Sequence, residues 1–143
     1  MMGMLMRRII LVVLVVGSLL PTAFAESEEP TTHIDALVKR LQSGEIDTAF
    51  VEFFSGSLIS EQKEMVPRVI ASQAKAAFEF YGRPSSYEIL ETSKMGTSLI
   101  RIKWITRHKS DAPLFWNSLF YRRNNKWEAV QFLVFDDPQK AGF

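Results

Sequence analysis

The chain has 143 residues, of which 47% are hydrophobic and 23% are charged, with no Cys and a formal net charge of +1. A chain of this length supports one hydrophobic core and therefore one domain. The absence of Cys excludes disulfides, thiol nucleophiles and Cys-ligated zinc. The near-neutral charge gives no indication of a nucleic-acid partner.

Residues 1–25 have the pattern of a secretory signal peptide. Arg7 and Arg8 precede an apolar run over residues 9–20, and Ala23-Phe24-Ala25 is a small-x-small cleavage signal. The run is shorter than the roughly 20 residues that cross a bilayer as a helix, so a retained anchor is the less favoured alternative. Cleavage would leave 15 Lys and Arg against 16 Asp and Glu. We expect a protein of the periplasm, or a secreted one.

The segment after the signal peptide predicts two helices. Residues 26–31 are acidic without an apolar period and are predicted to be a disordered terminus. Thr32 is the expected N-cap of the first helix, and Gly44 is the expected left-handed residue at its end. Asp47 is the expected N-cap of a second helix over residues 48–54.

A third helical region spans residues 60–81, with Ser60 as a candidate N-cap and Gly82 as its stop. Pro67 lies inside it and lacks the N–H that a helix interior requires. Either the helix kinks there, or one helix ends by Val66 and Pro67 opens the next as its first residue; we favour two helices. The residues expected on or near one face are Val69, Ile70, Gln73, Ala74, Ala77, Phe80 and Tyr81.

The second half of the sequence predicts four consecutive antiparallel strands over residues 87–92, 98–108, 114–123 and 127–136. Gly, Pro, Asn and Asp residues occupy the short breaks between them, as in successive hairpins. In the second strand an apolar face alternates with a largely cationic one, which indicates one buried and one wet face. The apolar face carries Ile100, Ile102, Trp104 and Thr106.

The last two strands are apolar on both faces, so both faces need a cover. The helices can cover one face. For the outer face we favour a second copy of the protein, giving a homodimer through the sheet, because large exposed aromatic patches are rare on monomers. The alternative cover is the C-terminal tail, residues 138–143, or an early helix.

Two segments give the sequence a family resemblance: DALVKRLQSGEIDTAFVEFF, and the closing NNKWEAVQFLVF after an aromatic meander. Together, over residues 32–136, they resemble the nuclear transport factor two-like (cystatin-like α+β) superfamily. The resemblance implies N-terminal helices packed on a curved four-stranded antiparallel sheet, a cone-shaped pocket between them, and frequent dimers through the outer sheet face. It implies no particular activity, because this fold hosts enzymes and non-catalytic binders alike.

The sequence contains no recognisable catalytic or metal-binding motif. His33 and His108 have no acidic partner at fixed spacing and are interpreted as surface residues; HExxH, G-x-S-x-G and Gly-rich phosphate loops are absent. We therefore predict no metal, no cofactor and no catalytic residue. Catalytic members of the resembling superfamily place an ionisable residue at the pocket mouth, but no motif selects one among Tyr81, Tyr87, Glu91, Tyr121 and Glu128.

Two sets of residues are candidates for binding. Five aromatic residues are candidates to line a pocket in the cone, although a filled core is the favoured interpretation: Phe50, Tyr81, Trp104, Trp116 and Tyr121. Arg101, Lys103 and Arg107 share one strand face, where charge either protects the sheet or contacts an anionic partner of the cell envelope. Nucleic acid is not expected for an exported protein.

We expect a single α+β domain over residues 32–137 that acts as an exported, non-enzymatic module for a small apolar ligand or an envelope partner. The alternative is a small isomerase- or dehydratase-like enzyme with a buried carboxylate or Tyr in the cone. An ionisable group facing a cavity would favour the enzyme. A filled or wholly apolar interior would favour the binding module.

Overall fold

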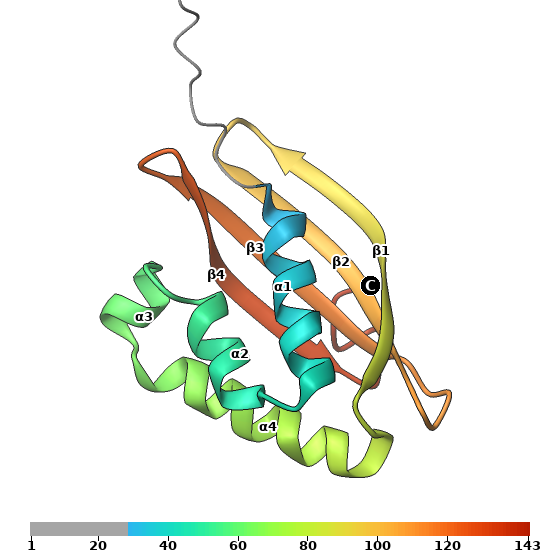
Figure 1. The fold of residues 1–143 in the computed structure, drawn as a ribbon. Coiled ribbons are helices and arrows are strands. Elements are labelled where there is room, and N and C mark those ends of the chain that lie inside the picture. Colours follow the sequence, from blue (N-terminus) through green and yellow to red (C-terminus); the bar gives the residue numbers. More distant parts are fainter. Residues whose placement is uncertain (1–28) are drawn as a thin grey trace, which may run out of the picture.

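The computed structural model describes residues 29–143, in which four helices precede four strands (Figure 1). The expected signal peptide and residues 26–28 lie outside the described residues. The helices are α1 (Pro30–Ser43), α2 (Ile46–Phe53), α3 (Leu58–Gln62) and α4 (Met65–Tyr81). The strands are β1 (Pro84–Met95), β2 (Leu99–His108), β3 (Leu114–Arg123) and β4 (Lys126–Phe135). No helix in this part of the chain is long and apolar enough to cross a membrane.

The four strands form one antiparallel sheet in the order β1-β2-β3-β4, as the successive turn signals predicted. The β3–β4 turn is the tightest: Asn124 and Asn125 have φ of 51° and 59°. Positive φ at both central residues is the conformation of a two-residue type I′ hairpin, which Asn tolerates better than most residues. The predicted α+β class and the four-stranded meander are confirmed.

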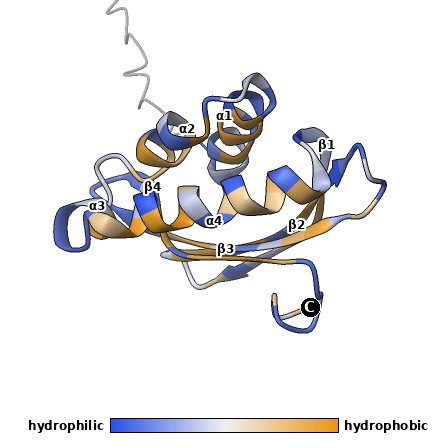
Figure 2. Ribbon diagram, turned by 90° about the horizontal axis from the view of Figure 1, so that it is seen from below, coloured by the Kyte–Doolittle hydropathy of each residue, from blue (hydrophilic) through white to orange (hydrophobic). Residues whose placement is uncertain are grey.

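The molecule has layers, with the helices on one face of the sheet and the C-terminal tail on the other (Figure 2). The side chains between helices and sheet are fully buried at the centre, where the rings of Trp104 and Trp116 stack with centroids 4.7 Å apart. Phe50 of α2 is also fully buried. The interior of the cone is therefore a filled core.

A β-bulge in β4 decides which side chains reach this core. Leu119 pairs with Gln131 but Phe120 pairs with Ala129, so Val130 is an extra residue in β4. The extra residue reverses the alternation along the strand. As a result, side chains on both sides of the bulge pack towards the helices: Trp127 and Ala129 before it, and Phe132 and Val134 after it.

The predicted helices exist, but three predicted caps are wrong. Helix α1 begins at Pro30 instead of after Thr32, because Pro suits the first helical position; residues 30 and 31 are therefore helical and not part of a disordered terminus. Asp47 lies inside the first turn of α2. Ser57, not Ser60, caps α3, and its hydroxyl accepts a hydrogen bond from the Ser60 N–H. The predicted left-handed Gly44, with φ of 84°, is confirmed.

The break before α4 confirms two helices, and Pro67 lies in the first turn of α4 as its third residue. The predicted buried face is partly wrong. Ala74 is buried as expected, together with Ala71 and Phe78, but Val69 and Phe80 are 50% and 80% exposed. The buried face of α4 includes Ala71, Ala74 and Phe78, and Val69 and Phe80 lie on the opposite side of the helix and point outwards.

The C-terminal tail packs on the outer face of the sheet, at its centre. The amide of Asn117 donates to the carbonyl oxygen of Ala141 at 2.8 Å, and Ala141 is fully buried. The ring of Phe143 lies edge-on to Phe115 with centroids 5.3 Å apart, and the Lys103 ammonium lies over the same ring. Part of the apolar outer face is thus covered within one chain. The homodimer through this face stays a prediction.

Deletion of residues 138–143 should lower the free energy of unfolding by about 1–3 kcal/mol, because it exposes Phe115 and leaves the buried Asn117 amide without its acceptor. Urea unfolding of full-length and shortened protein measures this loss. Sedimentation of the shortened protein in buffer without urea then shows whether the uncovered sheet face self-associates. An unchanged unfolding midpoint would contradict a structural role for the tail.

Candidate functional site

A groove of about 360 Å³ lies between α4 and the end of β4. Its walls are mostly apolar and come from α4, β3 and β4. The lining residues are Ile70, Gln73, Ala77, Tyr81, Leu114, Phe132, Leu133, Val134, Phe135 and Asp136. Its size lies at the lower end of the range typical of ligand sites, roughly 300–1,000 Å³.

The ionisable groups that line the groove are Tyr81 and Asp136, which contact each other. The Tyr81 hydroxyl donates a hydrogen bond to Asp136 Oδ2 at 3.0 Å. This hydrogen bond raises the pKa of Tyr81 above 10.0, because it stabilises the protonated phenol next to a carboxylate. A phenol with a raised pKa is a poor general base at neutral pH.

The five predicted ligand-binding residues do not meet in one cavity. Phe50, Trp104 and Trp116 are fully buried in the core. Tyr121, next to the buried Phe120 in β3, points to the opposite side of the sheet, and Tyr81 alone among the five lines the groove. Sequence reasoning missed the β4 part of the groove because it depends on the bulge at Val130.

The other candidate acid–base residues also lie apart from the groove. The Tyr87 hydroxyl donates to Asp35 Oδ1 at 3.1 Å and so joins β1 to α1. Burial, followed by this hydrogen bond, raises the pKa of Tyr87. Glu91 is exposed on β1. Glu128 is buried, but it has its own partners.

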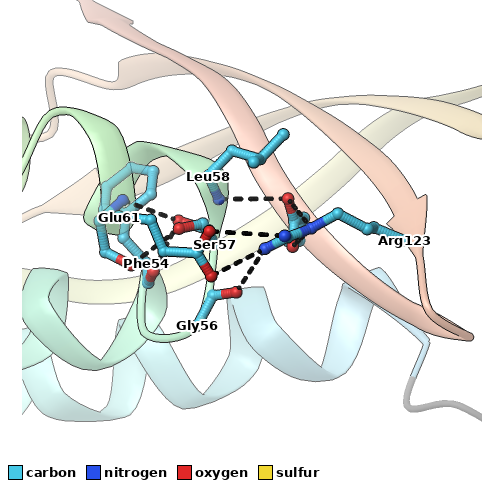
Figure 3. Close-up of polar contacts among 8 residues, drawn as sticks. Phe54, Gly56, Ser57, Leu58, Glu61 and Arg123 are labelled. Carbon is cyan, nitrogen blue, oxygen red and sulfur yellow. Dashed lines mark hydrogen bonds and ion pairs between the residues drawn. The ribbon is translucent and has the colours of Figure 1, made fainter.

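Glu128 belongs to an ion cluster that joins α3 to the β3–β4 hairpin; Figure 3 shows its partners Arg123 and Leu58 together with Glu61. Its carboxylate accepts hydrogen bonds from Arg123 Nε at 3.1 Å and from the Leu58 N–H at 3.2 Å. Arg123 also donates to Glu61 and to the Gly56 carbonyl oxygen. Hydrogen bonds to Glu61 first, and to Glu128 second, raise the pKa of Arg123. The members of the cluster pair with one another, and the cluster acts as a structural clamp.

His108 is buried, so its interpretation as a surface residue is wrong. Its Nδ1 lies 2.8 Å from the Gly82 carbonyl oxygen, and its Nε2 lies 2.7 Å from the Thr106 hydroxyl. Thr106 Oγ1 in turn accepts a hydrogen bond from the Trp116 indole N–H at 2.8 Å. A neutral His108 protonated on Nδ1 satisfies every member of this chain. His33 lies against Phe120, with ring centroids 6.2 Å apart.

Each of the three cations predicted to bind an anionic partner contacts neighbouring polar groups. Arg107 pairs with Glu88 at 2.8 Å, and Lys103 lies 3.9 Å from Glu91. Arg101 donates to the Asn117 side-chain oxygen at 2.9 Å. An anionic partner at these residues stays a prediction. Among residues 29–143, no group of three His, Asp or Glu side chains could hold a metal ion.

Comparison with known proteins supports the fold. No protein-family model matches the sequence, and no curated protein matches it. One similar crystal structure, at 2.00 Å, is of a Campylobacter jejuni protein provisionally named an NTF2-like transpeptidase. The match covers 71% of this chain and 97% of the Campylobacter jejuni chain, with a TM-score of 0.54. The chain has an NTF2-like fold. At 18% identity the likeness concerns the fold alone, which is the fold implied by the nuclear transport factor two-like resemblance.

The burial of His108 predicts a pH-dependent stability. Burial lowers its pKa below 6.5, an effect that the hydrogen bond to Gly82 partly offsets. The unfolded state therefore binds a proton more readily than the folded state. The contribution of His108 to stability should be constant above about pH 7 and fall as pH drops through 6.5 towards the folded-state pKa. Urea unfolding at pH 7.5 and 5.5 measures this loss.

The matched variant is His108→Gln. It should be less stable than the wild type at pH 7.5 by about 1–3 kcal/mol, because the buried row of hydrogen bonds from Gly82 to Trp116 loses one of its members. The variant should lose less stability between pH 7.5 and 5.5 than the wild type does. An equal loss in both proteins would contradict the role of His108.

Removing the clamp should destabilise the hairpin through Glu128. We expect Arg123→Met to lower the free energy of unfolding, since it leaves the buried Glu128 carboxylate without its cation. Adding Glu128→Gln to Arg123→Met should recover part of this loss. A double variant no more stable than the single one would show that the charge of Glu128 is not the cause.

Proposed function

We propose that the protein is an exported, non-enzymatic binding module whose ligand site is the groove between α4 and β4. The observation that carries this proposal is the distribution of filled and open space. The cone interior, where catalytic members of the superfamily would hold an ionisable group, contains the fully buried Phe50, Trp104 and Trp116. The open space lies instead at the groove, whose walls are mainly apolar.

The polar groups of the groove support binding over catalysis. The Tyr81 hydroxyl donates to Asp136, and the pKa of Tyr81 shifts away from the neutral range in which a general base works. The similar Campylobacter jejuni structure has a name that denotes acyl transfer, which requires an activated nucleophile. The groove lining contains no Ser, Thr or Lys side chain to serve as one.

Export is supported by the sequence of residues 1–25, where two Arg residues precede an apolar run and a small-x-small cleavage site. N-terminal sequencing of the protein recovered from its own host would test cleavage after Ala25.

A neutral apolar dye, N-phenyl-1-naphthylamine, tests the binding site. We expect saturable fluorescence enhancement at one site per chain. Ala77→Glu should weaken binding on the order of tenfold, equal to about 1.4 kcal/mol, because it places a carboxylate in the groove. The matched control is Ala76→Glu, on the neighbouring exposed position of α4 outside the groove lining.

The control should bind the dye as the wild type does, and urea unfolding should confirm that Ala77→Glu remains folded. If Ala77→Glu is destabilised, Gln73→Glu on the exposed rim of the groove replaces it. Absence of saturable binding, or equal weakening by the groove and control variants, would overturn the proposed site.

A further inference from the structure

The two edges of the sheet differ in how they are protected. Edge strand β1 carries Glu88, Glu91 and Lys94 and has two register irregularities along its length. Charges and bulges of this kind keep an edge from pairing with other chains. The last five residues of edge strand β4, Gln131–Phe135, carry no charge and no Pro. This half of β4 lacks the usual protection.

Polar contacts with α3 lie at the first half of β4. There the clamp joins α3 to the hairpin, through Arg123 with Glu61 and through the Leu58 N–H with Glu128. Beyond the bulge, β4 pairs with β3 on one side only. Among the described residues, no backbone hydrogen bond outside the regular elements involves Gln131–Phe135. The free edge is therefore a row of backbone donors and acceptors beside the groove.

The helix flanking this edge presents an apolar surface. Val69 and Phe80 are 50% and 80% exposed. At about 100° per residue, both lie on the same side of α4 as Gln73, which lines the groove. The opposite side of α4 packs into the core through Ala71 and Phe78, and Lys75, which pairs with Asp47 of α2, lies away from the groove. The exposed apolar side chains of α4 thus border the groove and not the helical layer.

The groove ends at a carboxylate that has no cationic partner among residues 29–143. Asp136 accepts one hydrogen bond, from Tyr81, and forms none of the ion pairs in this part of the chain. A carboxylate has about four acceptor positions. Asp136 can therefore accept from a Lys or Arg of a bound molecule.

These features select the chemistry of the occupant. A row of unpaired backbone groups is complementary to an extended polypeptide, which pairs with it by strand addition; an aliphatic molecule offers no donors or acceptors for it. Resting on the binding function proposed above, we propose that an extended segment of another protein adds to β4 at Gln131–Phe135. Its apolar side chains enter the groove and contact Phe80, and a Lys or Arg near one end reaches Asp136.

A second copy of the chain fits less well. Antiparallel pairing of Gln131–Phe135 with itself, centred on Leu133, would set Asp136 opposite Val130. No cation would then meet the carboxylate in either copy. A heterologous segment can provide both the apolar alternation and the charge.

Selection from a displayed library of random heptapeptides on the full-length protein tests the proposal. We expect enriched peptides with apolar residues at alternate positions and a Lys or Arg near one end. Binding of a synthetic enriched peptide should slow hydrogen exchange in Gln131–Phe135. N-methylation of alternate backbone amides in that peptide should weaken binding on the order of tenfold or more, because it removes strand pairing and keeps the side chains.

Protein variants locate the site. Phe135→Lys and Phe80→Ser change exposed side chains and should abolish peptide binding. Asp136→Asn should weaken binding of the cationic peptide but not of a version with Gln in place of its Lys or Arg. The matched control is Leu90→Lys, which places the same charge on a comparably exposed residue of the opposite edge and should leave binding unchanged.

Three results would overturn the proposal. One is failure to enrich any peptide that requires Phe135. Another is an enriched peptide that binds without protecting β4 amides. The third is self-association that Phe135→Lys abolishes in sedimentation without peptide, which would assign the edge to a second copy. If the apolar dye still binds in any of these cases, the groove remains a binding site and only its polypeptide ligand is disproved.

Discussion

The stacked indoles of Trp104 and Trp116 are the contact on which the rest of this structure depends. They come from neighbouring strands, are fully buried, and occupy the space between sheet and helices. Both indole N–H groups donate within the core, to Ser118 and to Thr106. The two rings therefore fill the cone and fix its polar contacts at once, because a buried indole N–H without an acceptor would be costly.

A filled cone moves the open surface of the domain to its edge. The helices that cover the indoles leave the groove between α4 and the last residues of β4. The clamp around Arg123 closes the other half of the same edge through α3 (Figure 3). On the outer face of the sheet, the tail contributes Ala141 and Phe143 (Figure 2). Within residues 29–143, the tail and the clamp thus cover part of the sheet, and the uncharged segment Gln131–Phe135 of β4 keeps a free edge.

Much of the fold follows from local patterns. Alternating apolar and polar residues placed the second strand with the correct face inwards, and Gly44 was correctly identified as the left-handed end of the first helix. The candidate site could be predicted from the sequence only in part. Of the residues predicted to bind a ligand, Tyr81 lines the groove, whereas the two Trp and Phe50 are core. Large aromatic residues suit a core and a pocket equally well, and sequence does not show which positions have space beside them.

By itself the sequence determined the order and type of the elements, because turn residues and hydrophobic period act locally. The tertiary structure decided which faces of β3 and β4 point inwards, because a single extra residue at Val130 reverses the alternation that would otherwise be read along the strand. It also decided that His108 is buried: the acceptor of its ring N–H is the carbonyl oxygen of Gly82, 26 positions earlier in the chain. A residue pattern carries no record of such a distant partner, so only the packed chain reveals it.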